Sequence, residues 1–491
     1  MPDHDVTLQP DACYLALKAK DARFDGRFFT GVTSTGIYCR PVCRVRTPRR
    51  ENCRFFAHAA QAESAGFRPC LRCRPELAPR AQAWSIQDAS ATLAQQAAHL
   101  LDEPEAWGDE SPSVEQVAAR LGVSDRHLRR IFEAQLGVSP LQYLQTRRLL
   151  TAKQLLADTA LPITQVALIS GFASMRRFNA AFVQHYGLSP TQLRREGADD
   201  GETRTVKLGY RPPYDVRAML GFFAARRIDG VELVDVERSR LGRTLAIEAQ
   251  GRTHTGWLTA TFDEPRTQVV LEVSEGLCEA LPAVIRRVRA LLDLDADPQA
   301  INAVLHASFP QGDGLRVPGA ANGYELAVRA VLGQQITVAA ARTLAQRLAD
   351  RFGDPIETPV PALRRLFPRA EVLAAAEGDA LGQLGIVRQR QAAIVAIAKA
   401  VAQGRLRLHG GAPLDTTVAA LKEIPGIGDW TAQYIAMRAL RWPDAFPASD
   451  VALHKALGVR EAKHPAREAE AASTPWKPWR SYAVIRAWSS L

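Results

Sequence analysis

The most informative stretch of the sequence is Leu421-Lys-Glu-Ile-Pro425-Gly426-Ile427-Gly428-Asp-Trp430-Thr431-Ala432. It predicts a hydrophobic helix, a tight Pro-Gly-Ile-Gly hairpin and a second helix that opens directly after Gly428. Glycines permit a close backbone approach, and the free N–H groups at the start of the second helix can bind a phosphate without reading base sequence. We therefore expect a helix-hairpin-helix that contacts DNA non-specifically through Gly426 and Gly428.

An aspartate follows this hairpin in the segment Phe446-Pro-Ala-Ser-Asp450-Val451, 22 residues after Gly428. It stands at a turn before another predicted helix. An aspartate in that position commonly caps the helix by accepting hydrogen bonds from its first N–H groups. Taken alone, the position predicts a cap and nothing more.

Together, the hairpin and this aspartate resemble the helix-hairpin-helix glycosylase superfamily, in which the residue matching Asp450 is catalytic. From about Val206 to Leu491 the chain resembles AlkA-type DNA-3-methyladenine glycosylase II. The matching segments are Tyr210-Arg-Pro-Pro-Tyr-Asp, Met219-Leu-Gly-Phe222, Ala330-Val-Leu-Gly-Gln-Gln335 and Trp476-Lys-Pro-Trp-Arg-Ser-Tyr482. The resemblance implies that Asp450 is catalytic as well as a cap. It also implies a minor-groove wedge at Gln335, where some relatives have an apolar residue.

The same resemblance implies a pocket for a flipped base, lined by Phe222, Trp430, Tyr434 and Trp488. An alkylated purine carries positive charge, which electron-rich rings attract by cation–π interaction. Any one of these rings taken singly is equally compatible with core packing. The Asp450 carboxylate would stabilise the oxocarbenium-like sugar and help water to attack C1′.

Two absences narrow the expected chemistry. Relatives that also cleave the DNA strand carry a lysine where this chain has Trp430, because a Schiff base needs an amine. No cysteine follows Cys278, so the iron–sulfur cluster of some relatives cannot form. We therefore expect a monofunctional hydrolase without lyase activity.

Four of the seven cysteines form two close pairs, Cys39 with Cys43 and Cys70 with Cys73, separated by 26 residues. Short C-x3-C and C-x2-C loops let two sulfurs converge on one ion, as in tetrahedral zinc sites. We expect these four residues to bind one Zn²⁺. The remaining cysteines, expected to be inert and buried, are Cys13, Cys53 and Cys278.

The residues around these pairs are Gly36-Ile-Tyr-Cys39-Arg-Pro-Val-Cys43-Arg and Phe67-Arg-Pro-Cys70-Leu-Arg-Cys73-Arg-Pro. With them, the first 80 residues resemble the N-terminal domain of the Ada methyl acceptor. The resemblance implies that Cys39 irreversibly takes a methyl group from a methylphosphotriester in DNA, one per chain. Spacing alone favours a purely structural zinc knuckle, whereas these flanking residues favour the acceptor.

Neighbouring arginines are expected to hold the DNA phosphates of this module. They are Arg40, Arg44, Arg46, Arg49 and Arg50. Methylation of one sulfur makes the centre less negative, which should tighten DNA binding and turn repair into a signal. The Pro-Cys-His site of the second Ada methyltransferase domain is missing after Cys73, so we expect no direct reversal of base O-alkylation.

Two similar halves lie further along, at Val114–Phe132 and Ile163–Phe182. Each predicts a short apolar helix, a glycine turn, a capping serine and a second helix with exposed arginines. This is the helix-turn-helix plan, in which the second helix enters the major groove. With a linking helix at Leu141–Ala157, the block resembles an AraC/XylS-type DNA-binding domain; a plain helical bundle is the alternative. Candidate groove residues are Asp125, Arg126, Arg129, Arg130, Ser174, Met175, Arg176 and Arg177.

The distribution of charge suits these assignments. The net charge is +10; residues 1–80 hold 14 Lys and Arg against 8 Asp and Glu, and residues 113–196 hold 11 against 5. Between them, residues 81–112 contain six acids and no Lys or Arg, as expected of a segment that avoids DNA. Positive charge favours a polyanionic partner, although it can serve solubility alone. No apolar run reaches the about 20 residues that span a bilayer.

These observations predict a multidomain, mainly α chain. We expect a small four-cysteine zinc α+β module (1–80), a helical double helix-turn-helix domain (84–196), a small mixed α/β domain (204–300) and an all-α helix-hairpin-helix glycosylase domain (301–491). A polar linker at 197–202 should precede the third domain. In that domain the alternating segments 244–248 and 268–273 predict strands.

The combined resemblances imply a repair protein for alkylated DNA that also regulates transcription. It would hydrolyse the N-glycosidic bond of alkylated purines such as 3-methyladenine and accept methyl groups from methylphosphotriesters. The alternative is a transcription activator whose glycosylase domain is retained mainly for DNA affinity. Expected partners are double-stranded DNA, both alkylated and promoter, with RNA polymerase as a further candidate. We expect a monomer without membrane contact, cytoplasmic and nucleoid-associated.

Overall fold

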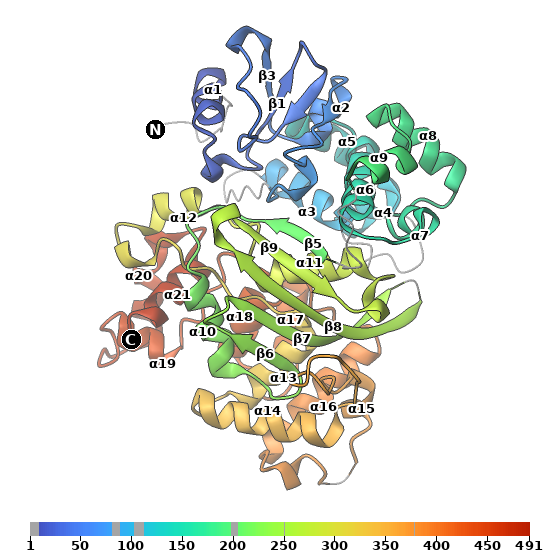
Figure 1. Cartoon of the computed structure of the whole chain (residues 1–491). Helices are drawn as coiled ribbons and strands as arrows, with labels where there is room; N and C mark the ends of the chain where they lie inside the picture. Colours follow the sequence, from blue (N-terminus) through green and yellow to red (C-terminus); the bar gives the residue numbers. More distant parts are fainter. Residues whose placement is uncertain (1–8, 81–88, 103–111, 198–204, 250, 378) are drawn as a thin grey trace.

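The computed structural model describes residues 9–80, 89–102, 112–197, 205–249, 251–377 and 379–491. Figure 1 shows four modules along the chain, from a blue N-terminal sheet to orange and red C-terminal helices. The predicted multidomain, mainly helical fold is confirmed. No helix in the described ranges is long and apolar enough to cross a membrane. Most of the predicted linker at 197–202, and parts of the acidic stretch 81–112, fall outside those ranges.

The N-terminal module is a four-stranded sheet covered by short helices. β1 pairs antiparallel with β2 and β3, and β2 pairs parallel with β4. Its core is small, built around Phe29, Tyr38 and Phe67, so a bound metal would add substantially to its stability. The elements are α1 (Pro10–Ala19), β1 (Phe29–Val32), β2 (Ile37–Cys39), β3 (Cys53–Phe56), α2 (Ala59–Ser64) and β4 (Arg68–Pro69).

The next module contains the two predicted helix-turn-helix units. Ser124 caps α5 and Ser174 caps α8 through side-chain hydrogen bonds, and each of these helices ends at a left-handed glycine, Gly137 or Gly187. The predicted linking helix extends one residue further at each end. The elements are α3 (Ala89–Asp102), α4 (Val114–Arg120), α5 (Asp125–Leu136), α6 (Pro140–Asp158), α7 (Ile163–Ile169), α8 (Met175–Tyr186) and α9 (Pro190–Gly197).

A five-stranded antiparallel sheet, ordered β5-β9-β8-β7-β6, forms the third module. Both segments predicted as strands lie in it, within β7 and as β9. Alternate residues of β9 face the core, as expected for a sheet with one buried face. The elements are β5 (Thr205–Gly209), α10 (Val216–Arg226), β6 (Glu232–Asp235), β7 (Arg240–Ala249), β8 (Arg252–Asp263), β9 (Gln268–Val273) and α11 (Leu281–Leu291).

The C-terminal module is helical, and the core that it builds also takes in Ile228 and Val231 of the third module. Its elements are α12 (Pro298–Leu305), α13 (Gly323–Leu332), α14 (Val338–Phe352), α15 (Ala370–Ala374), α16 (Arg388–Ala402), α17 (Leu414–Lys422), α18 (Asp429–Arg438), α19 (Val451–Ala456), α20 (Pro465–Ala472) and α21 (Arg480–Ser489).

The second helix-turn-helix unit and the sheet module share one hydrophobic core. Leu155 of α6 and Phe182 of α8 belong to the same buried cluster as Val206 and Leu271 of the sheet. The sequence suggests separate modules joined by a linker, but in the structure their apolar faces cover each other. Burial of apolar surface therefore holds these two modules together.

Arg211 ties three distant segments together. It is 0% exposed, and its guanidinium donates hydrogen bonds to five backbone carbonyls. The acceptors are Asp25, Pro79 and Arg80 of the N-terminal module, and Asp295 and Ala296 before α12. Burial lowers the pKa of Arg211 to about 10.

Replacing Arg211 with methionine is expected to lower the melting temperature by at least about 5 °C. The substitution leaves several buried carbonyls without a donor, and each such loss costs about 1–3 kcal/mol. Differential scanning calorimetry measures the change. The matched control is Arg217→Met, because the Arg217 side chain is 81% exposed. Equal melting temperatures for wild type and Arg211→Met would contradict the structural role of Arg211.

Candidate functional site

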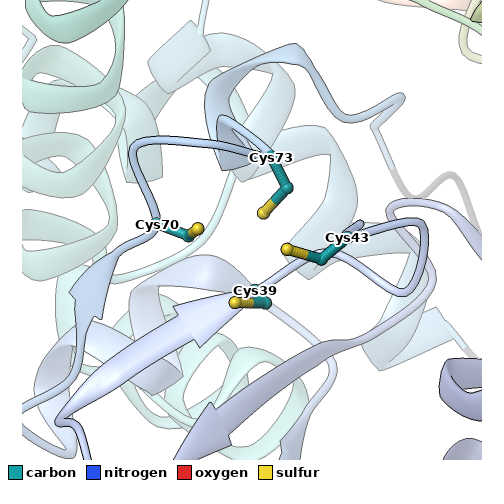
Figure 2. A group of neighbouring side chains, drawn as sticks. All are labelled: Cys39, Cys43, Cys70 and Cys73. Atoms are coloured by element: carbon teal, nitrogen blue, oxygen red, sulfur yellow. The ribbon is translucent and has the colours of Figure 1, made fainter. Parts of the chain in front are cut away.

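The four clustered cysteines are brought together by the pairing of β2 with β4. Cys39 ends β2, and Cys70 follows β4 directly; Tyr38 lies opposite Pro69 in this parallel pair. Cys43 and Cys73 come from the turns that follow. All four sulfur atoms lie within 4.8 Å of one another, and Figure 2 shows them pointing toward a common centre.

This donor set fits one zinc ion, as predicted. Four cysteine sulfurs around one point make a closed tetrahedral site. Hydrogen bonds with Cys39 lower the pKa of Cys43 to about 7 and also lower the pKa of Cys70. Hydrogen bonds inside the cluster raise the pKa of Cys39 and of Cys73. Such closely spaced sulfurs can all lose their protons only around a cation.

The other three cysteines are buried, form no disulfide and lie outside this cluster. They are Cys13, Cys53 and Cys278.

Arg40 is a correction to the predicted set of phosphate contacts. It is 8% exposed, and its guanidinium forms an ion pair with Asp25 and donates to the Cys73 carbonyl at 3.0 Å. Arg40 therefore braces the metal centre from inside and cannot reach DNA from this position. Arg44 and Arg46 are exposed, as a phosphate contact requires.

The other two arginines of this group also lie toward the surface. Arg49 is exposed, and the Arg50 guanidinium forms an ion pair with Asp11.

The second helix of each helix-turn-helix unit presents arginines to solvent. Arg126 and Arg130 on α5, and Arg176 and Arg177 on α8, are exposed. Arg129 is less available, since its guanidinium contacts Glu115 at 3.0 Å. Of the remaining candidates, Asp125 and Ser174 are exposed and Met175 is half-buried.

The predicted hairpin joins α17 to α18. Gly426 has a φ of 91°, a conformation that favours glycine, and Gly428 stands at the N-cap of α18. The Gln334 amide donates to the Gly426 carbonyl and to Thr431 Oγ1, both at 2.9 Å. Its neighbour Gln335 is exposed, with a left-handed φ of 55°. Gln335 is therefore an exposed residue next to one that contacts the hairpin.

Asp450 caps α19 and faces the aromatic residues at the same time. Its Oδ1 accepts hydrogen bonds from the Leu453 N–H at 2.7 Å and from Trp488 Nε1 at 3.0 Å. Its Oδ2 accepts from Trp430 Nε1 at 2.7 Å. Three donors fix the orientation of this carboxylate, which is 9% exposed.

A pocket of about 640 Å³ contains Asp450 and all four predicted aromatic residues. The rings of Trp430 and Tyr434 are stacked, with centroids 5.2 Å apart and planes at 11°. The ring centroid of Trp488 lies 6.3 Å from that of Tyr434. Phe222 comes from α10, so the pocket opens between the sheet module and the helical module. Its size is in the range of small-ligand sites.

The sequence analysis missed two arginines in this pocket, Arg226 and Arg438. Their guanidinium carbons lie 3.7 and 4.7 Å from the Phe222 ring centroid. These two guanidinium groups thus lie at the Phe222 ring, where the sequence analysis expected a cationic base to bind. Burial raises the pKa of Tyr434, but the positive charges of Arg438 and Arg226 outweigh it and lower that pKa overall. The sequence could have located them, because each arginine stands four residues after a predicted pocket residue and so lies on the same face of its helix.

Family models match nearly the whole chain. The metal binding domain of Ada matches residues 12–76, and a helix-turn-helix domain matches residues 117–196. The AlkA N-terminal domain matches residues 205–322. The model of the HhH-GPD superfamily base excision DNA repair protein matches residues 328–480.

Similar curated proteins match either nearly the whole chain or one part of it. A "Probable bifunctional transcriptional activator/DNA repair enzyme AlkA" of Mycobacterium tuberculosis is 36% identical over 98% of this chain and 96% of its own length. "DNA-3-methyladenine glycosylase 2" of Escherichia coli is 34% identical over 57% of this chain and 95% of its own. The "Bifunctional transcriptional activator/DNA repair enzyme Ada" of Escherichia coli is 33% identical over 39% of this chain and 50% of its own.

Proposed function

The chain belongs to the family of AlkA-type bifunctional transcriptional activators and DNA repair enzymes, and from this premise we propose what each of its sites does. It releases alkylated purines such as 3-methyladenine from DNA by hydrolysis, and it accepts methyl groups from DNA methylphosphotriesters. The helix-turn-helix units bind promoter DNA. We place the module boundaries near residues 80, 196 and 300.

The observation that carries the glycosylase assignment is the Asp450 carboxylate, held by two indole N–H groups at the wall of an aromatic pocket. A purine flipped out of the duplex stacks on these rings. As the C1′–N bond weakens, positive charge develops on the sugar, and the fixed carboxylate stabilises it. Water then attacks C1′. The hairpin N–H groups beyond Gly426 and Gly428 hold a phosphate of the same strand, and Gln335 fills the space left in the duplex.

Hydrolysis without strand cleavage fits the lining of the pocket. The lining that the structure describes includes arginines but no lysine. A lyase needs an amine to form a Schiff base with the sugar, and Trp430 occupies the position where a lysine would serve. We therefore infer a monofunctional glycosylase.

The four-cysteine centre is proposed as the methyl acceptor. A zinc ion bound by these cysteines keeps their sulfurs deprotonated and electron-rich. Cys39 forms a C–S bond to the methyl carbon, while the methyl–oxygen bond breaks and its electron pair returns to the phosphate. The product is a thioether and an ordinary phosphodiester, so each chain reacts once. Arg44 and Arg46 hold neighbouring phosphates.

Hydrogen bonds to the other sulfurs favour Cys39 as the acceptor. Cys73 Sγ accepts a hydrogen bond from the Arg40 N–H at 3.3 Å. Backbone N–H groups of Val45 and Cys73 likewise lower the pKa of Cys43 and Cys70, after the larger effect of hydrogen bonds with Cys39. A sulfur that accepts such a bond is a weaker nucleophile, so these three are less suited to the transfer.

Methylation of Cys39 is expected to increase affinity for promoter DNA about fivefold at low salt. It removes one negative charge beside a polyanion, and one charge pair about 4 Å apart is worth about 1 kcal/mol in water. Titration at fixed salt, before and after exposure to methylphosphotriester DNA, measures the change. Protein exposed to unmethylated DNA is the control, and unchanged affinity after methylation would contradict this signalling role.

Release of free 3-methyladenine from a methylated duplex tests the glycosylase assignment, and transfer of a labelled methyl group to Cys39 tests the acceptor. We further propose a cytoplasmic, nucleoid-associated monomer that works with RNA polymerase at promoters. The presence of two helix-turn-helix units supports this regulatory role.

A further inference from the structure

A second cavity, which we call the junction pocket, lies where three modules meet. Its volume is about 430 Å³, within the range of small-ligand sites. Its lining comes from the end of the N-terminal module, from α3, α6 and the turn between α7 and α8, and from β5 and α11 of the sheet module. In the linings that the structure describes, it shares no residue with the base pocket. The junction pocket is therefore a separate candidate site.

The lining of the junction pocket is mainly positive. In the described ranges it contains five arginines and two acids, Glu76 and Asp102. Both acids already have cationic partners, and one of the arginines pairs with a carboxylate outside the lining. These ion pairs are Lys153–Glu76, Arg80–Asp102, Arg147–Asp102 and Arg289–Asp295.

Arg148 differs from the paired arginines of this lining. In the described part of the chain its half-buried guanidinium has neither a hydrogen bond nor an ion pair. Burial lowers the pKa of Arg148, and no nearby carboxylate opposes that effect. The side chain lies against the turn between α7 and α8, since a Cβ atom added at Gly171 would be 2.8 Å from Arg148 Nε. Arg148 therefore brings an uncompensated positive charge to this turn.

Ser170 supplies a second unused polar group at the same turn. It is 5% exposed, and its Oγ has no hydrogen-bond partner among the described residues. Buried polar groups are nearly always paired, so this hydroxyl is suited to an acceptor that a ligand brings. Ser170 directly precedes Gly171, against which Arg148 packs. A guanidinium and a hydroxyl in one place can bind an anionic oxygen group together.

Apolar side chains of the junction pocket surround these two groups. Leu168, Phe172 and Ile285 belong to the lining, and Leu168 is 57% exposed although it is apolar. A ligand that fits has an anionic group and an apolar or aromatic body. Phosphate suits the excess of arginines better than a carboxylate, because it carries more charge and binds a guanidinium through two oxygens.

We propose that the junction pocket binds a small organic phosphate of the nucleoside monophosphate class. The phosphate group contacts Arg148 and Ser170, and the base lies on the apolar side chains. The turn that contains Ser170 leads into α8, which presents Arg176 and Arg177 to solvent. A bound phosphate brings negative charge close to this helix and weakens its attraction for DNA. This last consequence rests on the proposed promoter binding, whereas the ligand site does not.

Calorimetric titration with AMP tests the site in the full chain. Adenosine and inorganic phosphate should each bind at least about 10-fold more weakly than AMP, because each lacks one half of the contacts. Arg148→Gln should lower AMP affinity at least about 10-fold, and Ser170→Ala a few-fold. Both variants should keep the wild-type melting temperature, since neither side chain loses a partner. Arg217→Gln is the control, because Arg217 is 81% exposed and lies outside the described lining.

A promoter-DNA titration at low salt, with and without saturating AMP, tests the regulatory consequence. AMP should lower wild-type affinity about threefold and leave Arg148→Gln unaffected. The site is overturned if wild type does not bind AMP, or if both pocket variants bind it as tightly as wild type. A loss of promoter affinity in Arg148→Gln without AMP would make Arg148 a DNA contact and also overturn it. An AMP-insensitive promoter affinity overturns the regulatory role. Wild type that binds AMP but no promoter DNA supports the site and contradicts the proposed promoter binding itself.

Discussion

Base release is expected to fall at least about 10²–10³-fold when Asp450 is replaced by asparagine. The amide can still accept the hydrogen bond from the Leu453 N–H, so the cap of α19 and the fold should survive. It cannot supply the negative charge opposite the developing sugar cation. DNA binding should remain nearly intact, because the backbone N–H groups of the hairpin are untouched. Single-turnover release of 3-methyladenine and a binding titration measure the two effects separately.

Asp215→Asn is the matched control for the capping role of Asp450. Asp215 caps α10 by accepting a hydrogen bond from the Ala218 N–H at 2.8 Å, and it lies outside the pocket lining. Its substitution should leave base release unchanged. Wild-type rates in Asp450→Asn would show that another residue is catalytic. No release by the wild type would favour the alternative of an activator that keeps the domain for DNA affinity.

Zinc is expected at about one ion per chain, and Cys70→Ser should lose most of it together with the methyl-transfer activity. Three thiolates leave an open and weaker site, and metal binding in a small module is coupled to its folding. Elemental analysis of freshly purified protein gives the zinc content. A chelator should cause the same loss in the wild type.

Cys53→Ser provides the comparison within the same module. Cys53 is also buried, but it lies outside the cluster and donates a hydrogen bond to the Arg49 carbonyl at 3.3 Å. Its zinc content should match that of wild type. Undiminished zinc in Cys70→Ser would mean that the metal is held elsewhere.

The parts of each site that were predictable are those that local spacing constrains. Cys39, Cys43, Cys70 and Cys73 fall in two tight loops, and only the pairing of β2 with β4 was needed to unite them. The position of Asp450 before a helix predicted its capping role, and the resemblance of the hairpin and this aspartate to helix-hairpin-helix glycosylases implied the catalytic one. Its hydrogen bonds to two indoles join residues far apart in the sequence, and no local pattern indicates them.

The burial and the contacts of the arginine side chains were the properties least predictable from the sequence. Arg40 stands in a run of basic residues that otherwise lie toward the surface, and only its distant partner Asp25 shows that it is buried. Arg226 and Arg438 could have been placed beside Phe222 and Tyr434 from helical spacing. Their lack of carboxylate partners in the described ranges follows only from the tertiary packing. The common core of the helix-turn-helix and sheet modules is likewise a long-range property.

The hydrogen bonds of Arg211 also affect how the chain folds during its synthesis. The carbonyls of Asp25, Pro79 and Arg80 leave the ribosome long before the guanidinium that binds them. Domains usually fold in order during translation, the N-terminal one first. Here, anchoring of the first module is complete only after Ala296, the last acceptor of the set, has emerged. A nascent chain therefore carries its four-cysteine centre without this anchor until the third module has emerged, and it gains the anchor before the C-terminal helices are made.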